Sequence, residues 1–175
     1  IGRVSVEVGD VLTFPALQVH SLQHGIRVIE FQTPHYERLI VMFAQKVLTQ
    51  NHWDTDRAMG LINTEPYRLP EPQLLTEEDG YLEERIVDFP DFSSERIRMD
   101  ENVSRKFQCE GRYHLIICVK GKLRLESQSG SSLELPEEAV FLPASSSFYR
   151  VTNSGTDSMI FLRAVPVNAH SAKLD

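Results

Sequence analysis

The sequence predicts an all-β protein of jelly-roll barrels, one partial at the N-terminus and one complete at the C-terminus, with a short helix and a linker between them. Three observations carry this prediction: short runs rich in β-branched and aromatic residues, turn residues between the runs, and one segment that occurs twice. The C-terminal part of the first barrel covers 1–62, the linker 63–79 and the second barrel 80–170.

Composition indicates an ordinary soluble globular protein. The chain has 175 residues and a mass of 20.0 kDa, with 41% hydrophobic and 25% charged residues. No apolar run approaches the roughly 20 residues of a membrane-spanning helix, so we expect a cytoplasmic protein without a membrane partner. The net charge of -7 argues against nonspecific binding to nucleic acid. Cys109 and Cys118 are too few for a disulfide scaffold, and we expect both to be reduced and Cys118 to be buried.

The first sixty residues have mostly strand character. Four runs carry it: 4–8, 11–14, 26–31 and 39–43. A short helix is predicted over 54–62, with Asp54 as its N-cap. The proline-rich stretch that follows is predicted to be an extended linker, because proline removes backbone donors and disfavours helix in the residue before it.

Strand signals resume after the linker and recur at close spacing. Eight short strands are predicted at 84–89, 95–99, 114–119, 122–126, 132–135, 139–142, 148–152 and 159–164. Glycine, serine and asparagine punctuate the connections, as expected of hairpin turns. Such a series, without a helical period between strands, is typical of a jelly-roll sandwich or barrel.

One segment is repeated. Residues 11–16 align with 139–144 at a constant offset of 128, and on this offset His20 corresponds to Phe148. The first copy has only fourteen residues before Pro15, so the first barrel is incomplete. Its missing upstream strands come from chain outside this sequence, from a partner, or from a smaller arrangement. We favour the first, since the sequence also lacks an initiator Met.

Two motifs resemble a known family. Residues 9–21, an acidic turn, a strand, a proline and His20 five positions later, resemble the second conserved motif of cupin barrels. Residues 28–38 are similar to the segment of type I mannose-6-phosphate isomerases in which a Glu-x-Gln strand leads to an arginine, here Arg38. The 57–59 segment and the linker also resemble that family.

The resemblance implies a zinc-dependent sugar-phosphate aldose–ketose isomerase. In that family zinc is held by Gln, His and Glu from upstream strands and by a second His, which His20 matches. One ligand makes no site, so the remaining zinc ligands are expected outside this chain. Arg38 matches the arginine at the active-site mouth, where a fixed cation stabilises oxyanion charge or holds the phosphate. The alternatives are a structural histidine at a strand end and a surface arginine paired with Glu37 or Glu30.

Other candidates rank below these two. His24 and His35 are expected to face solvent, and Glu30 is a secondary candidate as carboxylate ligand or base. His114 lies where an upstream cupin ligand could fall, but Phe148 opposite it and the lack of a His-x-His pair favour a second barrel without metal.

Two further functions stay open. The chain is alternatively a noncatalytic module of two cupin barrels that binds a sugar or assembles with another subunit. A cupin that binds iron or manganese for other chemistry is the weaker possibility. The isomerase reading implies a small sugar phosphate as the partner.

Overall fold

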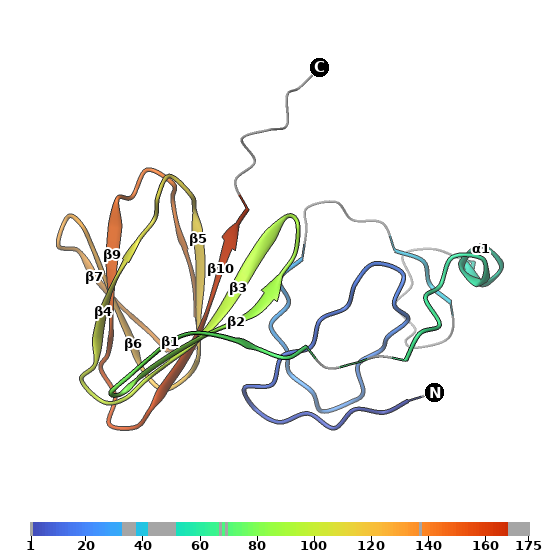
Figure 1. Ribbon diagram of the computed structural model, residues 1–175, viewed down its shortest axis with the longest axis horizontal. Coiled ribbons are helices and arrows are strands. Elements are labelled where there is room, and N and C mark those ends of the chain that lie inside the picture. Colours follow the sequence, from blue (N-terminus) through green and yellow to red (C-terminus); the bar gives the residue numbers. More distant parts are fainter. Residues whose placement is uncertain are drawn as a thin grey trace, which may run out of the picture. The chain divides into compact units, whose positions relative to one another are not determined.

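The computed structural model (Figure 1) describes residues 2–32, 38–41, 52–66, 68, 70–136 and 138–167. The chain divides into two compact units. We call the first, Ile1–Val11 with Pro70–Asp175, the jelly-roll unit, and the second, Leu12–Leu69, the loop unit. All the named strands lie in the jelly-roll unit. Among the described residues no helix is long and apolar enough to cross a membrane.

Ten antiparallel strands form the two sheets of the jelly-roll unit. They are β1 (Gln73–Glu78), β2 (Tyr81–Asp88), β3 (Phe92–Met99), β4 (Ser104–Gln108), β5 (His114–Lys120), β6 (Leu123–Ser127), β7 (Ser132–Leu135), β8 (Ala139–Leu142), β9 (Phe148–Asn153) and β10 (Met159–Pro166). The first sheet has the order β1-β2-β3-β10-β5-β8, and the second has the order β4-β9-β6-β7.

The pairing order identifies the architecture. Strand β6 pairs with β7, β5 with β8, β4 with β9 and β3 with β10. The pairs are nested along the chain, with β6–β7 innermost and β3–β10 outermost. The chain crosses between the two sheets as it follows this nested order (Figure 1). Eight strands rolled up in this way form a jelly roll. The β1–β2 hairpin extends the first sheet by two strands.

Residues from both sheets meet in one core. Alternate positions of the strands are buried, as in β5, where His114, Ile116 and Cys118 are buried and their neighbours are not. Ile97 and Phe161 of the first sheet belong to the same buried cluster as residues of the second sheet. The core is apolar on most of this inner surface, and charged residues occupy only part of it.

The eight strands predicted after the linker are confirmed. Two strands were not predicted. Strand β1 lies inside the segment predicted as a linker, and β4 has a mostly polar sequence in which Phe107 is the buried residue. Both cysteines are free thiols and both are buried, as predicted for Cys118.

The partial N-terminal barrel is not confirmed, and the strands predicted within it are wrong where the structure describes them. Residues 4–8, 11–14 and 26–31 form no strand, and 39–43 lies partly outside the described residues. The described part of the loop unit contains α1 (Thr55–Met59), preceded by Asp54, and an isolated bridge between Gln18 and Asn63. Strand-forming residues become a strand only where they join a β-ladder, and these segments join none within the described residues.

Candidate functional site

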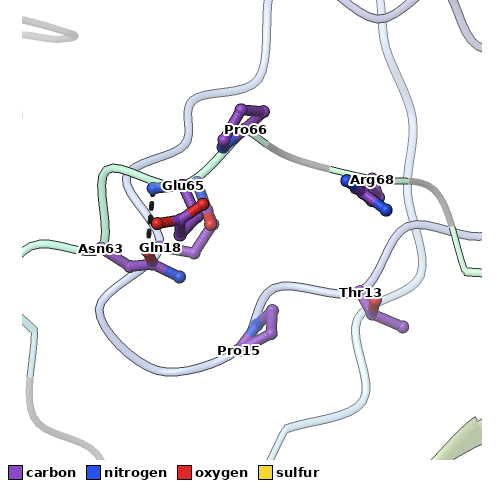
Figure 2. Close-up of a pocket in the computed structure, with 7 residues that line it drawn as sticks. All are labelled: Thr13, Pro15, Gln18, Asn63, Glu65, Pro66 and Arg68. Atoms are coloured by element: carbon purple, nitrogen blue, oxygen red, sulfur yellow. Dashed lines mark hydrogen bonds between the residues drawn. The ribbon is translucent and has the colours of Figure 1, made fainter.

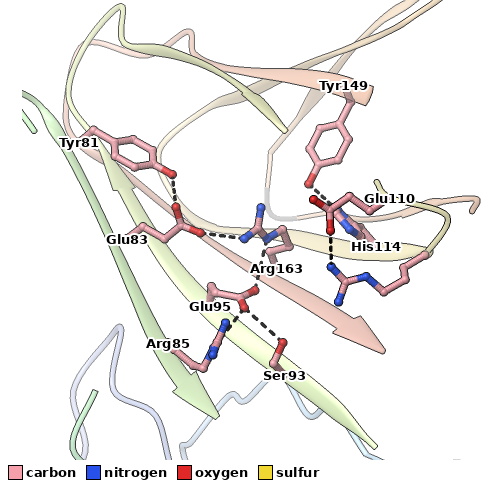
Figure 3. A network of polar contacts seen from close by, with 10 residues as sticks. Tyr81, Glu83, Arg85, Ser93, Glu95, Glu110, His114, Tyr149 and Arg163 are labelled. Carbon is pink, nitrogen blue, oxygen red and sulfur yellow. Dashed lines mark hydrogen bonds and ion pairs between the residues drawn. The ribbon is translucent and has the colours of Figure 1, made fainter. Parts of the chain in front are cut away.

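A row of charged side chains crosses the inner face of the first sheet. The register places Arg85 of β2 opposite Glu95 of β3, and Glu95 opposite Arg163 of β10. The charges therefore alternate across three neighbouring strands. Figure 3 shows these side chains converging with Glu83, Tyr81 and Ser93. The register of the sheet thus brings together six polar residues, which we call the arginine cluster: Tyr81, Glu83, Arg85, Ser93, Glu95 and Arg163.

Arg163 is the centre of the arginine cluster. It donates through Nη2 to Glu83 Oε1 at 2.7 Å and through Nε to Glu95 Oε2 at 3.3 Å. Glu95 also accepts from Ser93 at 3.2 Å and pairs with Arg85 at 3.7 Å. Only 4% of the Glu95 side chain and 14% of the Arg163 side chain are exposed. The two arginines and two carboxylates balance in charge, so the cluster offers no surplus charge to a ligand.

Tyr149 joins Arg163 to a buried histidine. The Arg163 charge opposes the rise in the Tyr149 pKa that burial causes, and the Tyr149 oxygen lies 2.9 Å from His114 Nδ1. One of these two groups donates to the other, so the Tyr149 hydroxyl occupies His114 Nδ1. Burial, with the charges of Arg163 and Arg112, lowers the pKa of His114 to about 4.

The two ring nitrogens of His114 have different surroundings. Nδ1 is occupied by the Tyr149 hydroxyl, and Nε2 is buried without a hydrogen-bond partner among the described residues. Across the part of the chain that the structure describes, no group of three or more His, Cys, Asp or Glu side chains could hold a metal ion. The arginine cluster is largely buried and balanced in charge, which are the features of a structural network.

His20 has different surroundings. Its ring is exposed and stacks on Phe14, with the ring centroids 4.1 Å apart. Its Nδ1 lies 2.9 Å from the carbonyl oxygen of Gln18, which can only accept, so Nδ1 carries the proton. Nε2 then keeps its lone pair. Histidines that bind metals usually donate their other N–H to a carboxylate or a backbone carbonyl, so this geometry fits one ligand of a metal site.

The other residues singled out in the sequence are placed on the surface or are not described. Arg38, Glu30 and His24 are exposed. His35 and Glu37 lie outside the described residues. The structure therefore does not test whether His20 and Arg38 belong to one site, and both stay predictions.

A hollow of about 350 Å³ lies beside the His20 motif within the loop unit. Figure 2 shows its lining side chains around an open space. They are Thr13, Pro15, Gln18, Asn63, Glu65, Pro66 and Arg68. Asn63 Oδ1 accepts from the Glu65 N–H at 2.9 Å, which fixes the orientation of its amide. Amide, hydroxyl, carboxylate and guanidinium groups line this hollow, and such groups hydrogen-bond sugar hydroxyls and anions.

Sequence reasoning missed the hollow because four of its seven lining residues belong to the predicted linker. Asn63, Glu65 and Arg68 belong to no motif, and the prolines around them indicate only extended chain. Their approach to the His20 motif depends on a long-range contact: the Asn63 N–H donates to the Leu17 carbonyl at 2.9 Å. No local pattern in the sequence signals that pairing.

Comparison with known proteins gives similarities of fold only. No family model matches the chain, and no curated protein matches it. KdgF from Halomonas sp. is 17% identical, over 56% of this chain and 89% of that protein, with a TM-score of 0.47. The Cnp3 cupin domain of Schizosaccharomyces pombe is 12% identical, over 60% and 70%, with a TM-score of 0.48. An RmlC-like cupin from Shewanella frigidimarina is 10% identical, over 57% and 88%, with a TM-score of 0.47.

The jelly-roll unit has the architecture that cupins share, and its nested strand order is the evidence for that assignment. Membership in the type I mannose-6-phosphate isomerases stays a prediction from the sequence. The same holds for zinc dependence.

Proposed function

We propose that this chain is part of a zinc-dependent aldose–ketose isomerase that acts on a sugar phosphate, of the type that interconverts mannose 6-phosphate and fructose 6-phosphate. The observation that carries the proposal is the state of His20. Its Nδ1 is engaged by the Gln18 carbonyl, and its Nε2 lone pair is left for a metal. His20 supplies one ligand, and the remaining ligands lie outside the described chain.

The proposed reaction moves a proton between adjacent carbons of the sugar through an enediol, so negative charge develops on oxygen. When bound, zinc orders and polarises the hydroxyl and carbonyl oxygens of the substrate. Arg38, which is always charged, stabilises the developing charge or holds the phosphate. Gln18 and Arg68 of the nearby hollow supply hydrogen bonds of the kind that sugar hydroxyls and phosphate accept.

The cellular location that fits this proposal is the cytoplasm. Cys109 and Cys118 are buried and form no disulfide, which suits a reducing compartment.

An assay of the complete protein with mannose 6-phosphate tests the proposal. Arg38→Ala should lower kcat by about a hundredfold while zinc stays bound, as loss of a transition-state electrostatic contact does. Arg27→Ala, which removes another exposed cation of the loop unit, should leave kcat unchanged. If only KM rises in Arg38→Ala, Arg38 anchors the phosphate. Absence of isomerase activity in the wild-type protein, or equal effects of the two variants, would contradict the proposal.

The second candidate is a noncatalytic module that binds a sugar or another subunit. The arginine cluster favours this candidate. Its arginines are paired with its own carboxylates, so the charged groups inside the jelly roll stabilise the fold and take no part in a reaction. Calorimetry with mannose 6-phosphate distinguishes the two functions. Binding without turnover supports the module, and binding with turnover supports the isomerase.

A further inference from the structure

The hollow of the loop unit is held in shape by backbone contacts. The Gln18 N–H donates to the Pro15 carbonyl at 3.1 Å, which closes a tight turn. The Asn63 N–H donates to the Leu17 carbonyl at 2.9 Å, so two segments far apart in the sequence form one rim. Pro15 and Pro66 lie on opposite sides of the space and restrict the backbone there, because the proline ring fixes φ (Figure 2). A ligand that enters the hollow therefore meets a preorganised rim.

Two opposite charges line this hollow without pairing with each other. Arg68 and Glu65 are both exposed and both belong to the lining. No ion pair or side-chain hydrogen bond joins either of them to another residue that the structure describes. Figure 2 shows Arg68 and Thr13 on one side of the open space, and Glu65 with Gln18 and Asn63 on the other. A ligand that carries an anion and a cation would complement both charges.

Neutral groups of the lining suit a frame that carries hydroxyls. Asn63 Oδ1 accepts from the Glu65 N–H at 2.9 Å, so the NH2 group of Asn63 remains as a donor. The Gln18 amide can both donate and accept, as sugar hydroxyls do. The volume of about 350 Å³ lies in the range of small-molecule sites.

We propose that this hollow binds a phosphorylated amino sugar, with its phosphate on Arg68 and its ammonium on Glu65. Its hydroxyls bind the amides of Gln18 and Asn63. A guanidinium binds phosphate through paired hydrogen bonds, and a carboxylate accepts strong hydrogen bonds from an ammonium. The sugar phosphate frame rests on the proposed function, which gives Gln18 and Arg68 to the substrate. The amino sugar therefore competes with mannose 6-phosphate and regulates the reaction.

Calorimetry with the complete protein at neutral pH compares ligands that differ in one group. Glucosamine 6-phosphate and glucose 6-phosphate differ only in the amino group that replaces one hydroxyl, and glucosamine lacks the phosphate. We expect glucosamine 6-phosphate to bind about tenfold or more tightly than either, because hydrogen bonds to charged groups contribute more than neutral ones. Phosphoethanolamine carries the phosphate and the ammonium without a sugar ring. It should bind more weakly, since it offers no hydroxyls to Gln18 and Asn63.

Two variants assign the charges to the two ends of the ligand. Glu65→Gln should weaken the binding of glucosamine 6-phosphate by about tenfold and leave that of glucose 6-phosphate unchanged. Arg68→Gln should weaken the binding of both phosphates by about tenfold and leave that of glucosamine unchanged. Glu71→Gln is the matched control, because Glu71 is also exposed, also precedes a proline and does not line the hollow. This control should bind every ligand as the wild type does.

Equal binding of glucosamine 6-phosphate and glucose 6-phosphate by the wild type, or binding of neither, would overturn the inference. Equal effects of Glu65→Gln and Glu71→Gln would do the same. Phosphoethanolamine that binds as tightly as glucosamine 6-phosphate would overturn the sugar class.

The mannose 6-phosphate assay separates this inference from the proposed function. An active isomerase without a preference for the amino sugar contradicts this inference alone. An inactive protein that shows the preference contradicts the proposed function alone. In an active isomerase, glucosamine 6-phosphate should raise the KM for mannose 6-phosphate and leave kcat unchanged. A fall in kcat without a change in KM would contradict the competition.

Discussion

Two segments of similar pattern, 11–16 and 139–144, which both end in Pro-Ala, behave differently in this protein. Residues 139–142 form strand β8, in which Val140 lies opposite Ile116 and Phe141 lies opposite Leu115 of β5. Residues 11–14, at the corresponding positions of the first copy, form no strand. The local sequence favours an extended chain in both places, but within the described residues only the second copy joins a β-ladder. Strand propensity is thus a condition for a strand, and the neighbour decides whether it forms.

The two units also contain histidines in different surroundings. His114 of the jelly-roll unit is buried, and its Nδ1 lies 2.9 Å from the Tyr149 hydroxyl. His20 of the loop unit is exposed, and its Nδ1 donates to the Gln18 carbonyl, which can only accept. We propose a structural role for the first histidine and metal binding for the second.

The largest effect is expected at the centre of the arginine cluster. Arg163→Met should destabilise the protein by about 3–5 kcal/mol, because it leaves Glu83 and Glu95 buried without their shared cation. The free energy of unfolding from chemical denaturation measures this. Arg124→Met removes the cation of an exposed pair, with about half of each side chain accessible, and should cost no more than about 1 kcal/mol. Similar losses in the two variants would contradict the structural role of the cluster.

A pH-dependent effect of intermediate size is expected at His114. Burial lowers its pKa from 6.5 to about 4 in the folded protein, so between these values the unfolded chain binds more protons. Stability should therefore fall as the pH decreases from about 6.5 to about 4, by about 3 kcal/mol in total from this group.

His114→Gln keeps an acceptor for the Tyr149 hydroxyl and removes the titration. The difference in unfolding free energy between wild type and this variant, measured against pH, isolates the histidine from the carboxylates that titrate in the same range. A difference that does not vary with pH would show that His114 is not buried in its neutral form.

The smallest effect is expected at Phe148, which corresponds to His20 on the repeat. Its ring is half-buried and lies under the Lys106 ammonium, with Nζ 3.7 Å from the ring centroid. Phe148→Leu should cost about 1 kcal/mol of stability and leave isomerase activity unchanged. Thermal unfolding and the mannose 6-phosphate assay check the two parts. Loss of activity would indicate that the second copy also contributes to the reaction.

The sequence predicted most of the jelly roll, because apolar alternation and turn residues are local signals. It missed β4, where Phe107 is the buried position in a polar run. It also missed the arginine cluster, since isolated glutamates and arginines indicate a surface until the register brings Arg85, Glu95 and Arg163 into one row. His20 was predicted from a local motif. The bridge between Gln18 and Asn63 beside it joins segments far apart in the sequence, and no local pattern indicates such a contact.

The zinc content of the complete protein, purified without chelator, tests the contrast between the two histidines most directly. We expect about one zinc per chain in the wild type and in His114→Gln, and less than about 0.2 in His20→Ala, because a site that loses one of its ligands retains metal poorly. Zinc lost from His114→Gln and kept by His20→Ala, or absent from the wild type, would contradict this expectation.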